Sequence, residues 1–113
     1  MESNSVVRAG TLALTRTPVP DAQSVSGSPV TAATALDEFA GVEVGVWEMT
    51  PGVMTDVEAD EVFVVLSGSA TIAFGDDSPT ITIGAGDVVR LAEGAETVWT
   101  VTDTLRKVYL TGV

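Results

Sequence analysis

The 113-residue chain contains neither cysteine nor histidine. Without cysteine it can form no disulfide, no zinc finger and no thiol-based redox centre. Without histidine it lacks the commonest general base and the commonest ligand of transition metals. Catalytic triads of the Ser-His-Asp and Cys-His kinds are therefore excluded.

Basic residues are also scarce. Five lysines and arginines stand against 16 aspartates and glutamates, which gives a formal net charge of −11. An acidic surface repels phosphate backbones and anionic lipids, so we expect neither a nucleic acid nor a membrane as a partner. No apolar run approaches the ~20 residues that span a bilayer, and residues 1–10 show no secretory pattern. We therefore expect a single cytoplasmic domain.

Helical periodicity is absent over any useful length, whereas short runs typical of strands recur between turn residues. Val42, Val44 and Val46 alternate with polar or small residues, and residues 62–66 are apolar on both faces. The expected strands are residues 42–47, 62–66, 70–74, 80–83, 88–91, 97–102 and 105–111. This pattern predicts an all-β antiparallel sandwich or barrel of the jelly-roll kind.

Breaks between these strands are expected where turn-forming or acidic residues cluster. Ser67-Gly68 and Asp103-Thr104 indicate turns, and the acidic residues 56–61 indicate an exposed loop. Residues 1–40 read as an N-terminal arm with possible edge strands, one of them at residues 11–15, and residues 41–113 as the barrel. Because extended arms often cover a sheet edge, their own or a neighbour's, we expect a homodimer with contacts near this arm.

Four segments in order carry a family resemblance: Gly-Val-Trp-Glu-Met-Thr-Pro-Gly at 45–52, Asp-Glu-Val-Phe-Val-Val-Leu-Ser-Gly at 60–68, Gly-Ala-Gly-Asp at 84–87, and Val-Trp-Thr-Val-Thr-Asp-Thr-Leu-Arg-Lys-Val-Tyr at 98–109. With them the chain resembles the cupin superfamily. It is most similar to small single-domain cupins related to the cupin domain of (S)-ureidoglycine aminohydrolase. The resemblance implies a double-stranded β-helix barrel.

The superfamily's motifs also imply four metal-ligand positions, of which Glu61 matches the glutamate. The three histidine positions hold other residues: Thr55 and Val57, or Met54 and Asp56 with a longer gap, and Thr97. A catalytic transition-metal site usually has three protein ligands. One or two carboxylates fall short, so we expect no metal cofactor.

Six residues are candidates for a binding pocket: Trp47, Glu61, Thr97, Trp99, Lys107 and Tyr109. Glu61 is either a pocket carboxylate or a solvated strand end. Lys107 either pairs with Glu61 inside the barrel or extends to its rim. The aromatic residues either line an apolar pocket or pack in the core, and core packing is favoured for Trp47.

The remaining carboxylates of this region could belong to a cation site. Glu48, Asp56, Glu58 and Asp60 could join Glu61 as oxygen ligands of a hard cation, but solvated charges are the favoured interpretation.

Two functions are compatible with these residues. The first is a cupin without the usual metal ligands that binds a small polar molecule or serves as a structural module. The alternative is a small hydrolase or isomerase resembling ureidoglycine aminohydrolase, acting on a small nitrogen-containing or carboxylate compound. In it Lys107 would bind an anion and Glu61 would handle a proton. The sequence assigns no catalytic residue.

Overall fold

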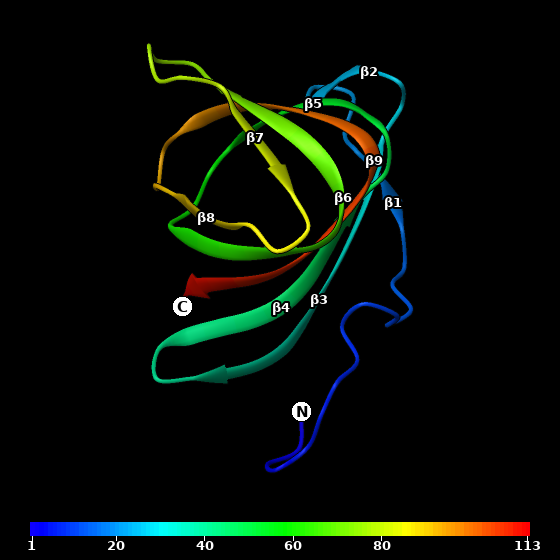
Figure 1. Ribbon diagram of the computed structural model, residues 1–113, viewed down its shortest axis with the longest axis vertical. Coiled ribbons are helices and arrows are strands. Elements are labelled where there is room, and N and C mark those ends of the chain that lie inside the picture. Colours follow the sequence, from blue (N-terminus) through cyan, green and yellow to red (C-terminus); the bar gives the residue numbers. More distant parts are fainter.

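The computed structural model describes residues 1–113 and consists of strands, turns and irregular segments (Figure 1). The strands are β1 (Thr17–Pro18), β2 (Ser24–Ser26), β3 (Val30–Phe39), β4 (Val42–Met49), β5 (Gly52–Val57), β6 (Glu61–Phe74), β7 (Ile81–Gly84), β8 (Val88–Leu91) and β9 (Glu96–Gly112). All strand pairs are antiparallel. The predicted all-β fold is confirmed. The chain contains no helix that is long and apolar enough to cross a membrane.

Two long strands, β6 and β9, form the framework of the barrel. They pair along their whole length, from Glu61 opposite Thr111 to Phe74 opposite Thr97. β4 and β5 pair with the other edge of β9, while β8 and β7 pair with the other edge of β6. Both long strands bend strongly, so the sheet curls into a jelly-roll barrel, and the β3–β4 hairpin extends from it (Figure 1).

The turns predicted at Ser67-Gly68 and Asp103-Thr104 are wrong, because β6 and β9 run through both places. The pairing of the two strands instead shifts register between residues 65 and 70, as at a β-bulge. Gly68 adopts a φ of 85°, which glycine tolerates and which turns also use. Bulges and turns favour the same residue types, so the sequence alone does not distinguish a bulge from a turn at this position.

The exposed loop predicted for residues 56–61 is also wrong at both ends. Asp56 and Val57 end β5, and Glu61 begins β6. β5 pairs with β9 along its whole length and with β2 at Val53 and Met54. The preceding Pro51 and Gly52 and the run of carboxylates concealed this strand.

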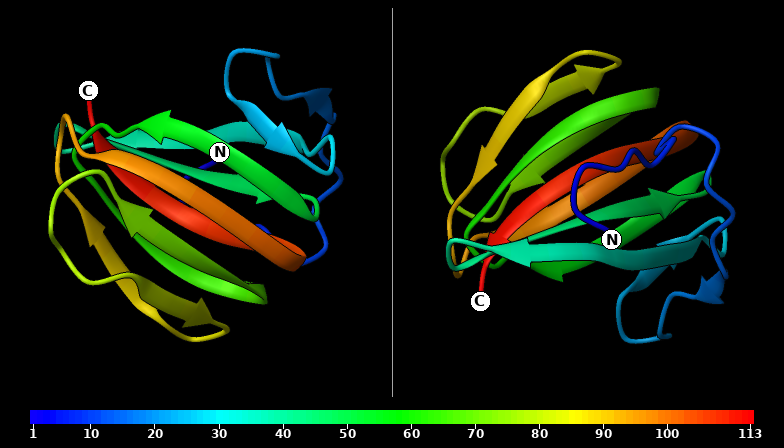
Figure 2. Two further views of the ribbon diagram at one scale, coloured as in Figure 1. Left: turned by 90° about the horizontal axis from the view of Figure 1, so that it is seen from above. Right: turned by 90° about the horizontal axis from the view of Figure 1, so that it is seen from below.

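The segment that precedes β1 is fixed to the barrel by a cluster of charges around the buried Glu48. The Arg106 guanidinium, on β9, donates to the carbonyl oxygens of Ala9 (2.9 Å) and Leu12 (2.7 Å). Glu48, expected to be solvated, is instead buried and pairs with Arg106 at 3.2 Å and with Arg16 at 3.0 Å. Burial alone would raise the pKa of Glu48, but these two guanidinium groups hold it below its usual range. The arm thus lies against its own β9 (Figure 2).

Within residues 1–40 the chain also contributes a full strand to the sheet. β3 pairs with β4 along its length, from Thr31 opposite Met49 to Phe39 opposite Val42. The boundary drawn at residue 40 coincides with the tight turn between these strands, where Ala40 and Gly41 both have positive φ. The possible edge strand at residues 11–15 is absent, and the short β1 follows it.

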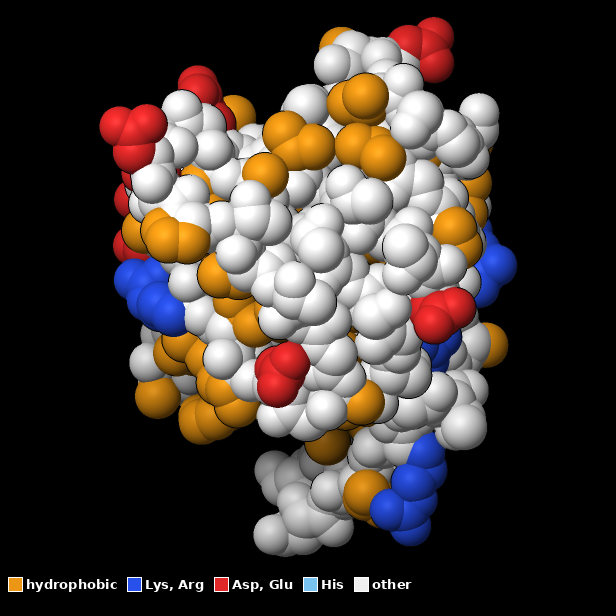
Figure 3. Space-filling view, turned by 45° about the horizontal axis from the view of Figure 1, so that its top comes forward, with side chains coloured by type: hydrophobic (Ala, Val, Ile, Leu, Met, Phe, Trp, Pro, Cys, Tyr) orange, Lys and Arg blue, Asp and Glu red, His pale blue; other side chains and the backbone are white.

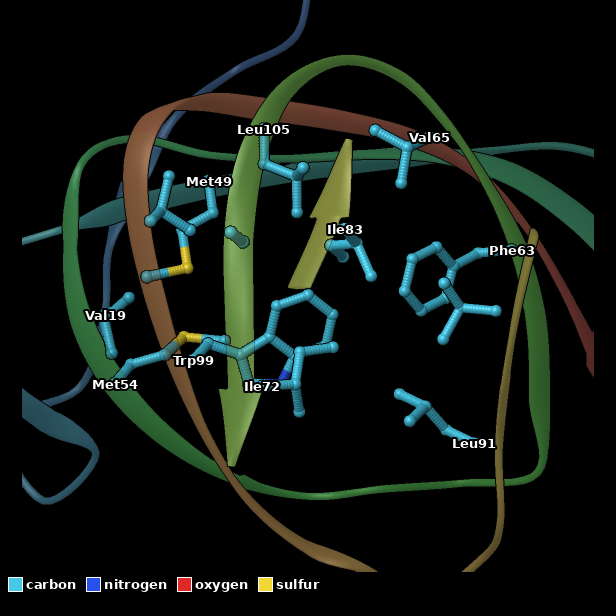
Figure 4. Packing of buried hydrophobic residues seen from close by; sticks show 13 residues of the cluster. Val19, Met49, Met54, Phe63, Val65, Ile72, Ile83, Leu91, Trp99 and Leu105 are labelled. Atoms are coloured by element: carbon cyan, nitrogen blue, oxygen red, sulfur yellow. The ribbon is translucent and has the colours of Figure 1, made fainter. Parts of the chain in front are cut away.

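Hydrophobic side chains fill most of the barrel interior (Figure 4). The cluster consists of Val19, Met49, Met54, Phe63, Val65, Ala70, Ile72, Ile83, Val89, Leu91, Trp99, Val101 and Leu105. Trp99 is its largest member and packs against Phe63 with ring centroids 5.8 Å apart. At the end of the barrel that holds Glu61 and Lys107, polar residues replace the apolar ones.

Candidate functional site

A cavity of about 380 Å³ lies at this end of the barrel. Five of the six predicted pocket residues line it: Trp47, Glu61, Trp99, Lys107 and Tyr109. The other lining residues are Ala33, Asp56, Val57, Glu58, Ala59 and Thr111. Several of the latter are exposed and form the rim, so the cavity opens to solvent. Its volume is within the range of sites for small ligands.

Strand register explains why these residues meet. Lys107 on β9 lies directly opposite Trp47 on β4 and Val65 on β6. Directly opposed residues of an antiparallel sheet point to the same face, and alternate residues of one strand do so as well. Tyr109 therefore shares the inner face with Lys107.

Lys107 is buried at the centre of the site, with 4% of its surface exposed. Its Nζ is 3.0 Å from Glu61 Oε1, so the ion pair considered from the sequence is formed and the rim position is wrong. The same Nζ lies 4.1, 4.6 and 5.0 Å from the ring centroids of Phe63, Trp47 and Trp99. Burial lowers the pKa of Lys107, while the nearby carboxylates oppose that shift. The result is one cation held by a carboxylate and three aromatic rings.

Tyr109 and Trp99 are fixed by polar partners at their outer ends. The Tyr109 hydroxyl donates to Glu43 Oε2 at 3.0 Å. Burial and the Glu43 carboxylate raise the pKa of Tyr109 to about 12, so it remains a hydrogen-bond donor at neutral pH. The Trp99 indole Nε1–H donates to Thr97 Oγ1 at 3.2 Å. Thr97 does not line the cavity but orients a ring that does.

Glu58, like Glu48, is buried rather than solvated. It was expected to be solvated, yet only 8% of it is exposed, and its Oε2 has no hydrogen-bond partner in the protein. Its N–H donates to the Ala95 carbonyl at 2.9 Å, and its own carbonyl accepts from the Gly94 N–H at 2.8 Å. The inward alternation of Met54 and Asp56 along β5 continues to Glu58, and this is the signal that could have found it.

The surroundings of Glu58 favour its protonated form. Burial and the carboxylates of Asp56 and Glu61 raise the pKa of Glu58 to about 7, although the Lys107 ammonium opposes them. A carboxyl group with a pKa near neutrality can exchange a proton with a ligand under ordinary conditions.

This shift makes folding stability depend on pH. The folded pKa of Glu58, about 7, exceeds its ordinary value of 4.5, so the folded state holds this proton more tightly. The free energy of unfolding should therefore fall as pH rises from 4.5 to 7, by on the order of 1–2 kcal/mol after solvent screening. Urea unfolding of the wild type and of Glu58→Gln between pH 5 and 8 isolates this contribution. Identical pH dependence in both proteins would refute it.

The residues at the superfamily's ligand positions do not fit a transition metal. Met54 and Asp56, rather than Thr55 and Val57, face inward, which selects the alignment with the longer gap. The positions then hold one thioether, two carboxylates and the Thr97 hydroxyl, and the Lys107 ammonium lies against Glu61.

Of the carboxylates considered as hard-cation ligands, two lie outside the cavity in ion pairs of their own. Glu48 is bound by arginines, and Asp60 pairs with Arg90 at 2.9 Å. No group of three or more aspartate, glutamate, histidine or cysteine side chains is arranged to hold a metal ion.

A second cavity, of about 410 Å³, lies beside β5 and the β6 end of the barrel. Gln23, Thr55, Phe74 and Glu96 are among its lining residues. Of the predicted pocket residues it contains only Thr97, and none of its charged side chains is buried. The cavity around Lys107 is therefore the better candidate site.

The family profile of the EutQ-like cupin domain matches residues 36–109 of the sequence. This chain belongs to the EutQ-like cupin family. The match includes the strands that carry Trp47, Glu61, Trp99 and Lys107. No curated protein matches the sequence of this EutQ-like cupin.

Solved structures agree with the cupin fold. The EutQ protein of Clostridium difficile is 18% identical, with a TM-score of 0.73 over 95% of this chain and 85% of that one. A protein of unknown function from Pseudomonas syringae pv. tomato, of the DUF861 family, is 26% identical, with a TM-score of 0.75. That alignment covers 88% of this cupin but only 44% of the other chain. A Rhizobium leguminosarum protein of unknown function is 22% identical, with a TM-score of 0.65 over 73% of this chain and 80% of that one.

These similarities confirm the predicted cupin superfamily. They point to the EutQ-like branch, and none of them demonstrates the closer resemblance to ureidoglycine aminohydrolase.

Proposed function

We propose that this EutQ-like cupin is a small-molecule-binding module whose ligand occupies the cavity around Lys107 and Glu61 without a transition metal. The observation that carries the proposal is the buried ion pair, 3.0 Å long, inside a wall of aromatic rings. Buried ion pairs are poor stabilisers compared with apolar packing of the same volume. Recognition of a polar ligand therefore explains a buried ion pair in this cavity better than a contribution to folding stability does.

A thermal-shift screen of small polar compounds tests this proposal. Compounds that bind the folded state should raise the melting temperature of the wild type. Ala33→Trp, at the exposed rim of the cavity, should abolish these shifts. Ala85→Trp, in the exposed β7–β8 turn and outside the lining of this cavity, is the matched control and should preserve them. Shifts that survive Ala33→Trp would place the ligand elsewhere and overturn the proposal.

Glu58 favours a second candidate function, a small hydrolase or isomerase of the kind to which ureidoglycine aminohydrolase belongs. A buried carboxyl with a pKa of about 7 beside a buried ammonium suits general acid–base catalysis. Lys107 is already paired with Glu61, so Glu58 is the better proton carrier of the two carboxylates. If this function holds, a ligand from the screen should be converted by the wild type, and Glu58→Gln should bind it without conversion. Conversion by Glu58→Gln at the wild-type rate would exclude this role.

We also propose that the protein forms a homodimer through the free edge of β3. Beyond Thr31, its last residue paired with β1, β3 has no strand on its outer edge, and its one further backbone partner is the N-terminal ammonium, which donates to the Leu36 carbonyl at 2.7 Å. Phe39 at its end is 62% exposed, and hydrophobic side chains elsewhere also reach the surface among charged ones (Figure 3). Uncovered edges of this kind favour pairing with another chain. Sedimentation at tens of micromolar should show a two-chain species, and a monomer would contradict the proposal.

A further inference from the structure

The charges inside the cavity do not balance. Three carboxylates line it, those of Asp56, Glu58 and Glu61, against the single ammonium of Lys107. Glu61 takes that ammonium at 3.0 Å. Asp56 and Glu58 are left without a basic partner, since no other lysine or arginine lines the cavity. At pH 8, above the pKa of about 7 of Glu58, the site therefore presents acceptor groups and negative charge to whatever enters it.

Glu58 adds an unmet hydrogen bond to this charge. The residue is 8% exposed, and its Oε2 is buried without any donor from the protein. Leaving a buried acceptor unpaired is unfavourable, and native proteins seldom do so. Its backbone is fixed by two hydrogen bonds to residues 94 and 95, so the side chain is held toward the cavity rather than free to leave. A ligand that brings an N–H donor would satisfy this oxygen.

The apolar walls suit the same kind of ligand. Trp47, Trp99 and Tyr109 present aromatic rings, whose faces attract cations. Lys107 Nζ already lies 4.6 Å from the Trp47 ring and 5.0 Å from the Trp99 ring, so these walls hold a cation in the protein itself. The cavity disfavours an anionic ligand, because its one ammonium is paired with Glu61 and two further carboxylates line the cavity.

We infer that the ligand of this cavity is a small organic ammonium compound, whose N–H groups donate to Glu58 and Asp56 while its apolar part lies against Trp47 and Tyr109. This inference rests on the proposed function and names the ligand class of the same site. The sequence left two ligand types open, a nitrogen-containing compound and a carboxylate, and the inference favours the nitrogen-containing one.

A matched set of three compounds tests the inference: benzylammonium, benzyl alcohol and benzoate, each titrated into the wild type by calorimetry at pH 8. The three share a ring and differ mainly in the charge of the attached group. The ammonium compound should bind at least tenfold more tightly than the alcohol, because each charge-assisted hydrogen bond is worth about a factor of ten. Benzoate should bind most weakly.

Variants then assign the effect to the carboxylates. Glu58→Gln and Asp56→Asn keep the shape of each side chain and should each weaken benzylammonium binding about tenfold. Glu2→Gln makes the same charge change in the arm, away from every cavity lining, and should leave binding unchanged. Circular dichroism checks that each variant is folded. If one carboxylate variant fails to fold, the other and the wild-type comparison still decide the question.

The possible failures are distinct. Equal or tighter binding of the alcohol or of benzoate at a site that Ala33→Trp blocks overturns the ammonium inference and leaves the proposed function standing. Benzylammonium binding that Glu58→Gln and Asp56→Asn do not weaken overturns the inference in the same way. Binding that Ala33→Trp does not block overturns both.

Discussion

Replacing Lys107 by methionine should destabilise the domain by about 3 kcal/mol at pH 8, because removal of one partner leaves a buried charge uncompensated. Lys107 is the only cation among the three carboxylates that line the cavity, and its contact with Glu61 is 3.0 Å long. Methionine keeps the unbranched apolar stem that packs among the rings, so loss of charge is the main change. Urea unfolding followed by circular dichroism measures the effect.

Lowering the pH should reduce the destabilisation caused by Lys107→Met. Protonation of a carboxylate removes the charge that Lys107 no longer balances, so the gap between the variant and the wild type should narrow from pH 8 to pH 5. Arg90→Met is the matched control. It breaks a surface ion pair with Asp60 in which both side chains are 58% exposed. It should lower the free energy of unfolding by less than about 1 kcal/mol. If Lys107→Met is no more destabilising than Arg90→Met, the ammonium does not have the central position described.

Gly68→Ala should destabilise the protein by about 3 kcal/mol or more, since it combines backbone strain with a clash that cannot relax cheaply. A Cβ at this position would lie 2.1 Å from the Thr104 carbonyl oxygen and 2.8 Å from that of Asp103. The residue also has a φ of 85°, which side chains other than glycine disfavour. Both long strands pass through this point, so any shift there disturbs β6 and β9 together.

Gly86→Ala separates the two contributions to the Gly68 effect. Gly86 has nearly the same φ, 90°, but a Cβ there would meet nothing within 4 Å. We expect Gly86→Ala to lower the free energy of unfolding by about 1 kcal/mol, the cost of the backbone conformation alone. Equal losses in the two variants, measured by urea unfolding, would show that the close approach of β9 to Gly68 is not a constraint on the bulge.

The inner face of β9 could be predicted from the sequence because its alternation is regular on each side of the bend. This alternation puts Trp99, Lys107 and Tyr109 on one face of the strand, and all three line the cavity. The meeting of Lys107 with Glu61 was foreseen only as one of two possibilities. A lysine in an apolar strand needs a partner when it points inward, but its direction depends on register with the neighbouring strands, and register is not local information.

Glu58 and the bulges could not be predicted for a related reason. A run of carboxylates is usually solvated, and only the pairing of β5 with β9 turns Asp56 and then Glu58 inward. Gly68 is typical of a turn, and only its partner strand makes it a bulge. In each case local composition indicated exposed or broken structure, and contacts distant in the sequence determined the outcome.

The most direct test of the proposed binding site uses the two tryptophans. The chain contains two, Trp47 and Trp99, and both line the cavity. The indole N–H region of a ¹H–¹⁵N spectrum should therefore contain two signals, each reporting on the site. With the protein treated with a chelator, we predict that ligands from the screen shift both signals in the wild type. In Ala33→Trp, whose spectrum contains a third indole signal from the introduced tryptophan, they should shift neither the Trp47 nor the Trp99 signal. Signals that no ligand moves, or that move only after a divalent metal is added, would contradict a metal-independent binding site in this cavity.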